Sequence, residues 1–288
     1  DFITDTVTVL SKLNADFNLS VTEGCSPVDI TIENKSSGAT EYYWYWNYDG
    51  TLDAAVLASA NSTSGAASFT QQFVNTAGGT RTDSNTLIIG YGNGCYAMKK
   101  KAVFIKSSID AQFTYTQPDP CDSSTVTFTN NTNYAKSYNW VFGDGSSEIR
   151  DNTTDFEHVF KNIKTNDTLF IVTMTAISEG GCTDIMQQTI PVWSRVDANF
   201  NIPISQGCPR EIDSLFTATI ENKSVGNAAN TYQWFIDGNP VATSTNLVYD
   251  YFNDQPTLRN YIVRLVATNP HDCSTEKKGT ITVFEYVD

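Results

Sequence analysis

The chain of 288 residues has few of the side chains from which catalytic and nucleic-acid-binding sites are built. It contains only two histidines, and 18 basic side chains stand against 32 acidic ones, for a net charge of −14. A negative surface repels the phosphates of nucleic acids and the head groups of anionic lipids. No apolar run approaches the ~20 residues of a membrane-spanning helix. These absences argue against an enzyme, a nucleic-acid-binding protein and membrane insertion.

The sequence also lacks the sustained 3.6-residue hydrophobic period that is typical of helices. Short segments alternate apolar and polar residues instead, as in the run that contains Tyr138, Trp140 and Phe142. Such alternation is typical of strands with one buried face, and the Asp144-Gly145 pair that follows is a hairpin-turn signal. We therefore expect an all-β fold. The alanine-rich stretch 52–60 is interpreted as an inserted loop.

A pattern of two cysteines and one tryptophan occurs three times along the chain. In each copy an Ala-x-Phe motif stands eight residues before the first cysteine, and an alternating run around a tryptophan separates the two cysteines. The copies contain Phe17, Cys25, Trp46 and Cys95; Phe113, Cys121, Trp140 and Cys182; and Phe200, Cys208, Trp234 and Cys273. A tryptophan that recurs at one position is typical of a core, so we expect Trp46, Trp140 and Trp234 to be buried.

These repeats predict three antiparallel β-sandwiches with immunoglobulin-like topology, arranged end to end. The expected domain limits are 14–109, 110–196 and 197–288. Residues 1–13 are expected to hold the closing strand and linker of a preceding repeat, because residues 6–10 alternate like the closing strands of the other units. Further copies are therefore expected to flank this chain in a longer protein.

The second repeat resembles the polycystic kidney disease (PKD) domain. The segment Tyr138–Gly145 reads Tyr-Asn-Trp-Val-Phe-Gly-Asp-Gly, and His158-Val159-Phe160 follows it. The PKD signature is Tyr-x-Trp-Asp-Phe-Gly-Asp-Gly with a later His-x-Tyr, so Val141 and Phe160 depart from it. The other two repeats lack the full Gly-Asp-Gly and join the resemblance through their register with this one.

The cysteine pairs extend the resemblance to a narrower group. Cys25-Ser26-Pro27 and Cys208-Pro209 are similar to PKD repeats in giant surface proteins of Bacteroidota, including gliding-motility adhesins exported by type IX secretion. The resemblance implies an extracellular, non-catalytic stalk on a Gram-negative cell surface. Its implied partners are neighbouring repeats, and surface glycans or other adhesin components. The alternative is a polysaccharide-binding accessory module of a secreted hydrolase.

Strand direction predicts how the cysteines pair. In each repeat the first cysteine precedes the second strand and the second cysteine follows the sixth, so the two lie at opposite ends of a sandwich. Strands of ~17–20 Å separate them beyond the reach of a disulfide. We therefore expect bridges between neighbouring repeats, with Cys95 and Cys208 left for units outside this chain. The predicted bridges are Cys25–Cys182 and Cys121–Cys273; the internal alternative is Cys25–Cys95, Cys121–Cys182 and Cys208–Cys273.

Two further sites are weighed from residue types alone. Asp144, Asp151 and Asp155 could supply oxygen ligands to calcium, although ordinary turn hydrogen bonding is the favoured reading of Asp144. No cofactor is otherwise expected. Trp44 lies near Tyr43 and Tyr45 and has no counterpart in the other repeats, so this aromatic cluster is the possible ligand surface.

Overall fold

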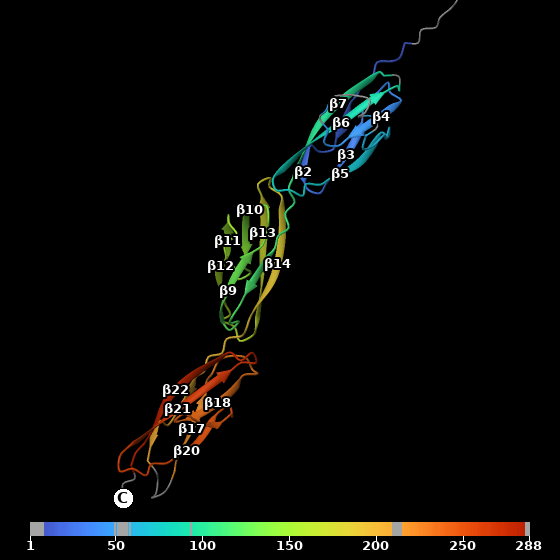
Figure 1. Ribbon diagram of the computed structural model, residues 1–288. Helices are drawn as coiled ribbons and strands as arrows, with labels where there is room; N and C mark the ends of the chain where they lie inside the picture. The colour runs from blue at the N-terminus through green and yellow to red at the C-terminus, as the bar shows by residue number, and fades with distance from the viewer. Residues whose placement is uncertain are drawn as a thin grey trace, which may run out of the picture.

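The protein is built from strands that form three β-sandwiches in single file (Figure 1). The computed structural model describes residues 9–48, 50, 57, 59–92, 94–208 and 215–285. Apart from Leu57, which has a helical conformation, the regular elements among these residues are strands. The predicted insertion at 52–60 lies largely outside them. The fold is therefore all-β, with tandem immunoglobulin-like sandwiches, as predicted.

Each sandwich consists of a three-stranded sheet that faces a larger sheet. In the first sandwich the sheet orders are β1-β3-β5 and β2-β7-β6-β4. Its strands are β1 (Phe17–Leu19), β2 (Glu23–Cys25), β3 (Val28–Asn34), β4 (Glu41–Tyr45), β5 (Ser68–Phe73), β6 (Thr80–Gly90) and β7 (Tyr96–Lys106). All pairings are antiparallel except that of β2 with β7, which is parallel.

The second and third sandwiches repeat this plan. The second has sheets β12-β9-β8 and β11-β10-β13-β14. Its strands are β8 (Phe113–Thr116), β9 (Ser123–Asn130), β10 (Ala135–Val141), β11 (Ser147–Arg150), β12 (Phe156–Lys161), β13 (Thr168–Ser178) and β14 (Thr183–Val192). The third has sheets β15-β17-β20 and β16-β22-β21-β18-β19. Its strands are β15 (Phe200–Asn201), β16 (Gln206–Gly207), β17 (Phe216–Asn222), β18 (Thr231–Ile236), β19 (Asn239–Ala242), β20 (Leu247–Tyr251), β21 (Arg259–Thr268) and β22 (Ser274–Val283).

Burial follows the period-two pattern along each central strand. In β13, Val172, Met174 and Ala176 are fully buried, whereas Leu169 and Ile171 on the other face are exposed. A strand places alternate side chains on opposite faces of its sheet, so one face fills the space between the two sheets. The predicted alternation of Tyr138, Trp140 and Phe142 is confirmed, because all three are buried.

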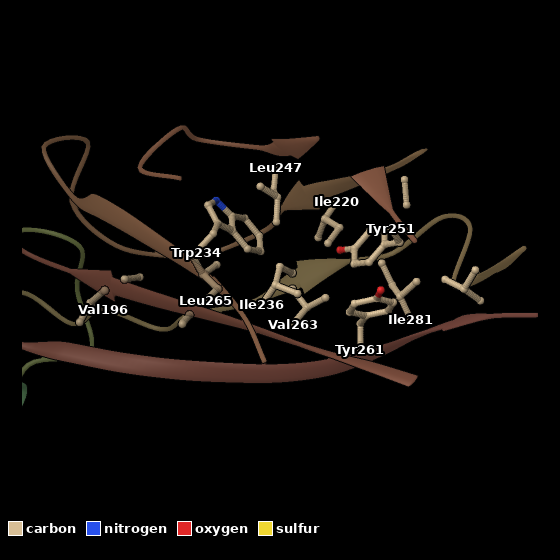
Figure 2. Packing of buried hydrophobic residues seen from close by; sticks show 14 of the residues in the cluster. Val196, Ile220, Trp234, Ile236, Leu247, Tyr251, Tyr261, Val263, Leu265 and Ile281 are labelled. Atoms are coloured by element: carbon tan, nitrogen blue, oxygen red, sulfur yellow. The ribbon is translucent and has the colours of Figure 1, made fainter. Parts of the chain in front are cut away.

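Each sandwich has its own hydrophobic core. In the third sandwich the core contains Trp234, Tyr251, Tyr261, Ile220 and Ile281, which interdigitate between the two sheets (Figure 2). Burial of each large apolar side chain contributes about 1.5–3 kcal/mol. At the second junction, Cys121 and Trp193 of the second sandwich pack against the edge of the third core.

The tryptophan of the first core is Trp44, and the prediction of Trp46 at this position is wrong. Trp44 has no exposed surface and pairs with Leu87 of β6, as Trp234 pairs with Leu265 of β21. Trp46 lies just beyond β4, half-buried against the edge of the core. Both residues share one alternation phase, so the sequence pattern could not choose between them.

The predicted closing strand at 6–10 falls mainly on residues 1–8, which lie outside the described residues. Val9 and Leu10 are described; they are exposed and belong to no strand. None of the described strands pairs with them, and a strand without a partner leaves its backbone groups to water.

Candidate functional site

The sandwiches are joined by two disulfides, one at each junction. Cys25 bridges to Cys182 and Cys121 bridges to Cys273, each with a Cα–Cα distance of 5.8 Å. These are the cross-repeat pairs that strand direction predicts. The internal pairing would require Cys182 and Cys273 to bond within their own sandwiches, and the structure shows that they do not.

The local fold places one cysteine at each facing end. Cys25 ends β2, whose parallel pairing with β7 puts it beside Lys106, where the chain leaves the first sandwich. Cys182 is the last residue of the loop between β13 and β14, at the end of the second sandwich that faces the first. The first cysteine of one sandwich therefore meets the second cysteine of the next.

The hairpins that carry the second cysteines share one turn conformation. Between the last paired residues, Ile177–Thr183 and Thr268–Ser274, each loop has five residues and ends in the cysteine. The residue just before the cysteine has a positive φ, 80° at Gly181 and 64° at Asp272. Glycine and aspartate tolerate this left-handed conformation, which turns the cysteine toward the neighbouring sandwich.

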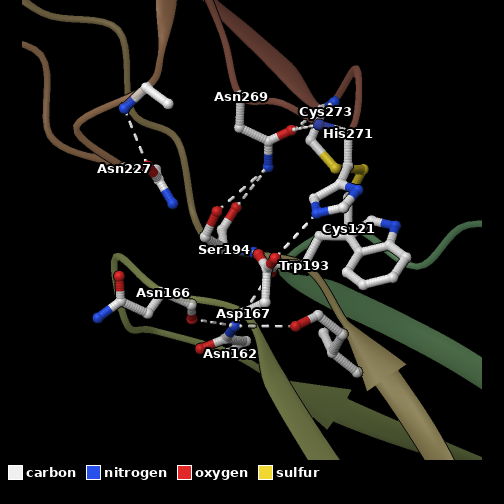
Figure 3. Close-up of polar contacts among 12 residues, drawn as sticks. Cys121, Asn162, Asn166, Asp167, Trp193, Ser194, Asn227, Asn269, His271 and Cys273 are labelled. Atoms are coloured by element: carbon white, nitrogen blue, oxygen red, sulfur yellow. Dashed lines mark hydrogen bonds and ion pairs between the residues drawn. A yellow bond between two sulfur atoms is a disulfide. The ribbon is translucent and has the colours of Figure 1, made fainter.

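Polar contacts support the disulfide at the second junction (Figure 3). The buried Asn269 side chain donates to Ser194 O at 2.8 Å, and its Oδ1 accepts the backbone N–H groups of His271 and Cys273. The His271 ring stacks on Trp193 at 4.0 Å between centroids. The hairpin of the third sandwich is thereby held against the end of the second by hydrogen bonds and a ring contact as well as by sulfur.

Asp167 completes the second junction from the side of the second sandwich. Its Oδ2 lies 2.8 Å from His271 Nε2, and its Oδ1 accepts the Ser194 N–H at 2.8 Å (Figure 3). Burial raises the pKa of this carboxyl, but the hydrogen bonds from Ser194 and His271 outweigh burial and hold the pKa below its usual value. The carboxylate is therefore the ionised hydrogen-bond acceptor of the contact at neutral pH.

The first junction is less polar. Gly180, which corresponds to His271, lies against the aliphatic part of Lys106: a Cβ at Gly180 would stand 3.0 Å from Lys106 Cγ. Tyr134 packs in the same way on Gly78, where a Cβ would come within 2.6 Å of its ring. Glycine at these two positions allows the sandwiches to approach closely.

Three asparagines that sequence reasoning missed shape the ends that receive the hairpins. Each donates from Nδ2 to the closing strand and to its own loop, and accepts a loop N–H at Oδ1. The residues are Asn75 (to Ile105 O and Gly79 O), Asn162 (to Val192 O and Asn166 O) and Asn253 (to Val283 O and Thr257 O). All three are at most 7% exposed. An aromatic-x-Asn motif that recurs at Phe73, Phe160 and Tyr251 is the signal that could have found them.

The calcium candidates do not gather around a common point. Asp144 Oδ1 accepts the Ser146 N–H at 2.9 Å, which is the expected turn hydrogen bond, and its Oδ2 lies 2.7 Å from His158 Nε2. Asp151 Oδ1 accepts a hydrogen bond from Asn152 Nδ2 at 3.1 Å, and Asp155 is exposed. In the described part of the chain, no three His, Cys, Asp or Glu side chains are arranged to hold a metal ion.

The prediction of a ligand surface at Trp44 and Tyr45 is wrong, because both side chains are buried. Trp44 is fully buried and donates from Nε1 to Ser64 O at 2.9 Å, and Tyr45 is 3% exposed. The Tyr43 hydroxyl donates to Glu41, and burial followed by the nearby Glu41 charge raises the pKa of this phenol. The buried rings of Trp44 and Tyr45 therefore cannot stack on a sugar, whereas the half-buried Tyr43 stays a candidate.

The His158 ring packs between an aromatic ring and a carboxylate. It stacks on Phe142 at 3.9 Å between centroids and contacts Asp144. Its Nε2 lies 2.7 Å from Asp144 Oδ2 and 3.4 Å from Ser146 Oγ, and the Ser146 hydroxyl donates to Asp144 Oδ1. The acid and the hydroxyl thus meet the same ring nitrogen, whereas in a catalytic triad they meet opposite nitrogens of the imidazole. No helix among the described residues is long and apolar enough to cross a membrane.

Comparison with known proteins gives structural neighbours alone. No protein-family model matches the chain, and no curated protein matches its sequence. The I67–I69 I-band fragment of titin is similar over 97% of this chain and 100% of that one, with 8% identity and a TM-score of 0.48. The D1–D4 ectodomain fragment of ICAM-5 is similar over 96% of this chain and 78% of that one, with 7% identity and a TM-score of 0.39. The fibronectin(III)-like modules of CbhA from Clostridium thermocellum are similar over 60% of this chain and 94% of that one, with 10% identity and a TM-score of 0.31.

Proposed function

We propose that the chain is a non-catalytic spacer, a stalk segment of a large secreted bacterial surface adhesin of the gliding-motility type. The observation that carries this proposal is the pair of disulfides across both junctions. A bridge beside a short linker leaves two covalent connections between neighbouring sandwiches, which restricts bending. The PKD resemblance and the cysteine pattern support the bacterial surface location.

The chemistry of the chain fits an extracellular rod. Disulfides persist in oxidising compartments, outside the cytosol. The net charge of −14 keeps neighbouring rods soluble and apart. In a repeat array each unit contacts mainly its neighbours, so the number of units sets the length of the rod. Such an array can act as a spacer without a binding pocket in any unit. Partners are accordingly the adjoining repeats, and surface glycans or other adhesin components at the tip.

Small-angle X-ray scattering tests the spacer role. The oxidised chain is expected to scatter as a straight rod. A variant with Cys25, Cys121, Cys182 and Cys273 all replaced by serine is expected to have a shorter mean end-to-end distance and a broader distance distribution. The Cys208→Ser variant is the matched control, because it removes a sulfur outside both bridges. An unchanged distribution in the fourfold variant contradicts a stiffening role.

The alternative of a polysaccharide-binding module loses two of its three residues, because Trp44 and Tyr45 are buried. The intact chain is therefore expected to stay in the supernatant when it is mixed with insoluble polysaccharides. Retention that an excess of soluble oligosaccharide reverses would favour the binding module over the stalk.

A further inference from the structure

The two junction disulfides differ in the access that solvent has to their cysteines. Cys25 is an exposed residue, and its partner Cys182 is 4% exposed. Cys121 is half-buried and packs on the edge of the third core, and its partner Cys273 is 5% exposed. Thiol–disulfide exchange begins when a thiolate attacks one sulfur, so its rate depends on access to that sulfur. Of the four bridged cysteines, Cys25 is the one that an external thiol reaches most easily.

A lysine lies beside the first disulfide. Cys25 pairs with Lys106 in the parallel ladder of β2 and β7. The aliphatic part of Lys106 lies against Gly180, in the loop that ends in Cys182. The Lys106 ammonium is 3.6 Å from Glu23, whose side chain is the more exposed of the pair. A nearby cation stabilises thiolates, so this lysine favours the approach of an anionic thiol and the departure of the Cys182 thiolate.

Carboxylates lie beside the second disulfide instead. Asp119, Asp122 and Asp272 line a cavity of about 540 Å³ together with the two bridged cysteines. Negative charge repels an anionic thiol and disfavours a departing thiolate. The second disulfide is therefore less accessible than the first and has less favourable electrostatic surroundings for exchange.

The second junction also has contacts that do not depend on sulfur (Figure 3). Asn269 donates to Ser194 O at 2.8 Å, and both residues are buried. The His271 ring lies 2.8 Å from Asp167 and stacks on Trp193. These contacts remain available when the disulfide is open, so they are expected to keep the second and third sandwiches aligned.

The first junction has no comparable support. Among the described residues, no hydrogen bond or ion pair connects the first sandwich to the second. Beside the disulfide, Gly180 lies against the Lys106 side chain and Gly78 against the Tyr134 ring. Van der Waals contacts of this kind are individually weak. An open disulfide is therefore expected to free the first junction to bend.

We propose that the Cys25–Cys182 disulfide is a modification site for small thiols, and that its opening turns the first junction into a hinge while the second junction stays aligned. The proposal rests on the spacer function, because it makes the stiffness of the rod sensitive to thiols at one point.

Two exchange steps open the bridge. In the first step, the thiolate of a small thiol attacks Cys25 Sγ, the S–S bond breaks, and Cys182 leaves as a thiolate. The product is a mixed disulfide on Cys25. In the second step, another thiolate attacks the sulfur of the bound small thiol, and Cys25 leaves as a thiolate. The two cysteines thereby gain two electrons and two protons, and two molecules of the small thiol become one disulfide.

Exchange kinetics on the full chain test the site. The chain is mixed with reduced glutathione, quenched with acid at intervals, alkylated and mapped by mass spectrometry. We expect the Cys25–Cys182 bridge to open about tenfold faster than Cys121–Cys273, with the transient glutathione adduct on Cys25. Equal rates, faster opening of the second bridge, or an adduct mainly on Cys182 would overturn the proposal.

A charge variant tests the lysine. Lys106→Met retains the aliphatic contact with Gly180 and is expected to slow opening by glutathione about threefold. Cysteamine has a thiolate form without net charge, so its rate is expected to fall less. Lys99→Met, at an exposed position of β7 away from the junction, is the control for the change in net charge and is expected to react like the parent chain. The parent rate in Lys106→Met would refute the role of this lysine.

Small-angle X-ray scattering separates the hinge from the spacer function. Cys25→Ser/Cys182→Ser is expected to broaden the distance distribution as much as the fourfold serine variant does. Cys121→Ser/Cys273→Ser is expected to keep the parent distribution. Equal broadening in the two double variants overturns the hinge and leaves the spacer function intact, whereas an unchanged distribution in the fourfold variant is the result that defeats the spacer function itself.

Discussion

Trp44, Trp140 and Trp234 occupy the same place in three cores but differ in the hydrogen bonding of the indole. Trp44 and Trp234 donate to Ser64 O and Ser244 O, each at 2.9 Å. The Nε1 of Trp140 has no hydrogen-bond partner among the described residues. A donor that is buried without a partner lowers the stability of a core, so the second core tolerates replacement of its tryptophan better.

Phenylalanine substitution measures this difference. Trp234→Phe removes a hydrogen bond as well as ring volume, whereas Trp140→Phe removes ring volume alone. We expect Trp234→Phe to lower the free energy of unfolding of its sandwich by about 1 kcal/mol more than Trp140→Phe does. Hydrogen exchange read by peptide mass spectrometry resolves each sandwich. Equal losses would show that the indole hydrogen bond has no net effect.

A second residue-scale prediction concerns acid stability. Burial raises the pKa of Asp144, but hydrogen bonds from Ser146 and His158 outweigh burial and hold the pKa below its usual value. Stability from this carboxylate is therefore full above its unfolded pKa of about 3.9 and is lost as pH falls through the lower folded pKa. Asp144→Asn is expected to flatten the fall in denaturant midpoint of the second sandwich below pH 4.

The exposed Asp151→Asn variant is the control for this titration and is expected to keep the parent pH profile. A profile that Asp144→Asn leaves unchanged would contradict the assigned role of the Ser146 and His158 hydrogen bonds.

At the scale of elements, each junction consists of a hairpin on one side and, on the other, a loop that a buried asparagine holds against the closing strand.

The disulfides also restrict the unfolded chain of each sandwich. When the second sandwich unfolds next to a folded first one, Cys182 stays bonded to Cys25, which lies beside Lys106. The unfolded segment from Lys106 to Cys182 is then a closed loop of roughly 75 residues.

Loss of one bridge is therefore expected to destabilise the sandwiches that it joins. The chain-entropy model assigns about 4.5 kcal/mol to a loop of this length. The second sandwich takes part in both bridges, so full reduction is expected to raise its hydrogen-exchange rates more than those of the first or third. The Cys121→Ser/Cys273→Ser variant should spare the first sandwich. Equal acceleration in all three sandwiches would contradict this account.

At the scale of the whole molecule, stiffness is expected to come from sulfur and not from calcium. The Asp144 oxygens accept hydrogen bonds from Ser146 and contact His158, which leaves them poorly placed for a cation. We expect a chelator to leave the melting temperature and the scattering profile unchanged, whereas a reductant changes both. A fall in melting temperature that chelator causes and calcium restores would reveal a site and overturn this expectation.

The all-β class, the three sandwiches and the buried face of the Tyr138, Trp140 and Phe142 run followed from the sequence, because alternation and turn residues act over a few positions. Strand direction was also enough to place the cysteines at opposite ends of a sandwich and so to pair Cys25 with Cys182. The missed aromatic-x-Asn motif at Asn75, Asn162 and Asn253 was equally readable, since it too is a local repeat.

Only the tertiary structure decided which of Trp44 and Trp46 fills the first core, because both face inward and the choice depends on packing against β6. It also decided that His271 meets Asp167 and Trp193. These residues come from different sandwiches, and their contact depends on how two rigid bodies are held together. Periodicity within a strand carries no information about that placement.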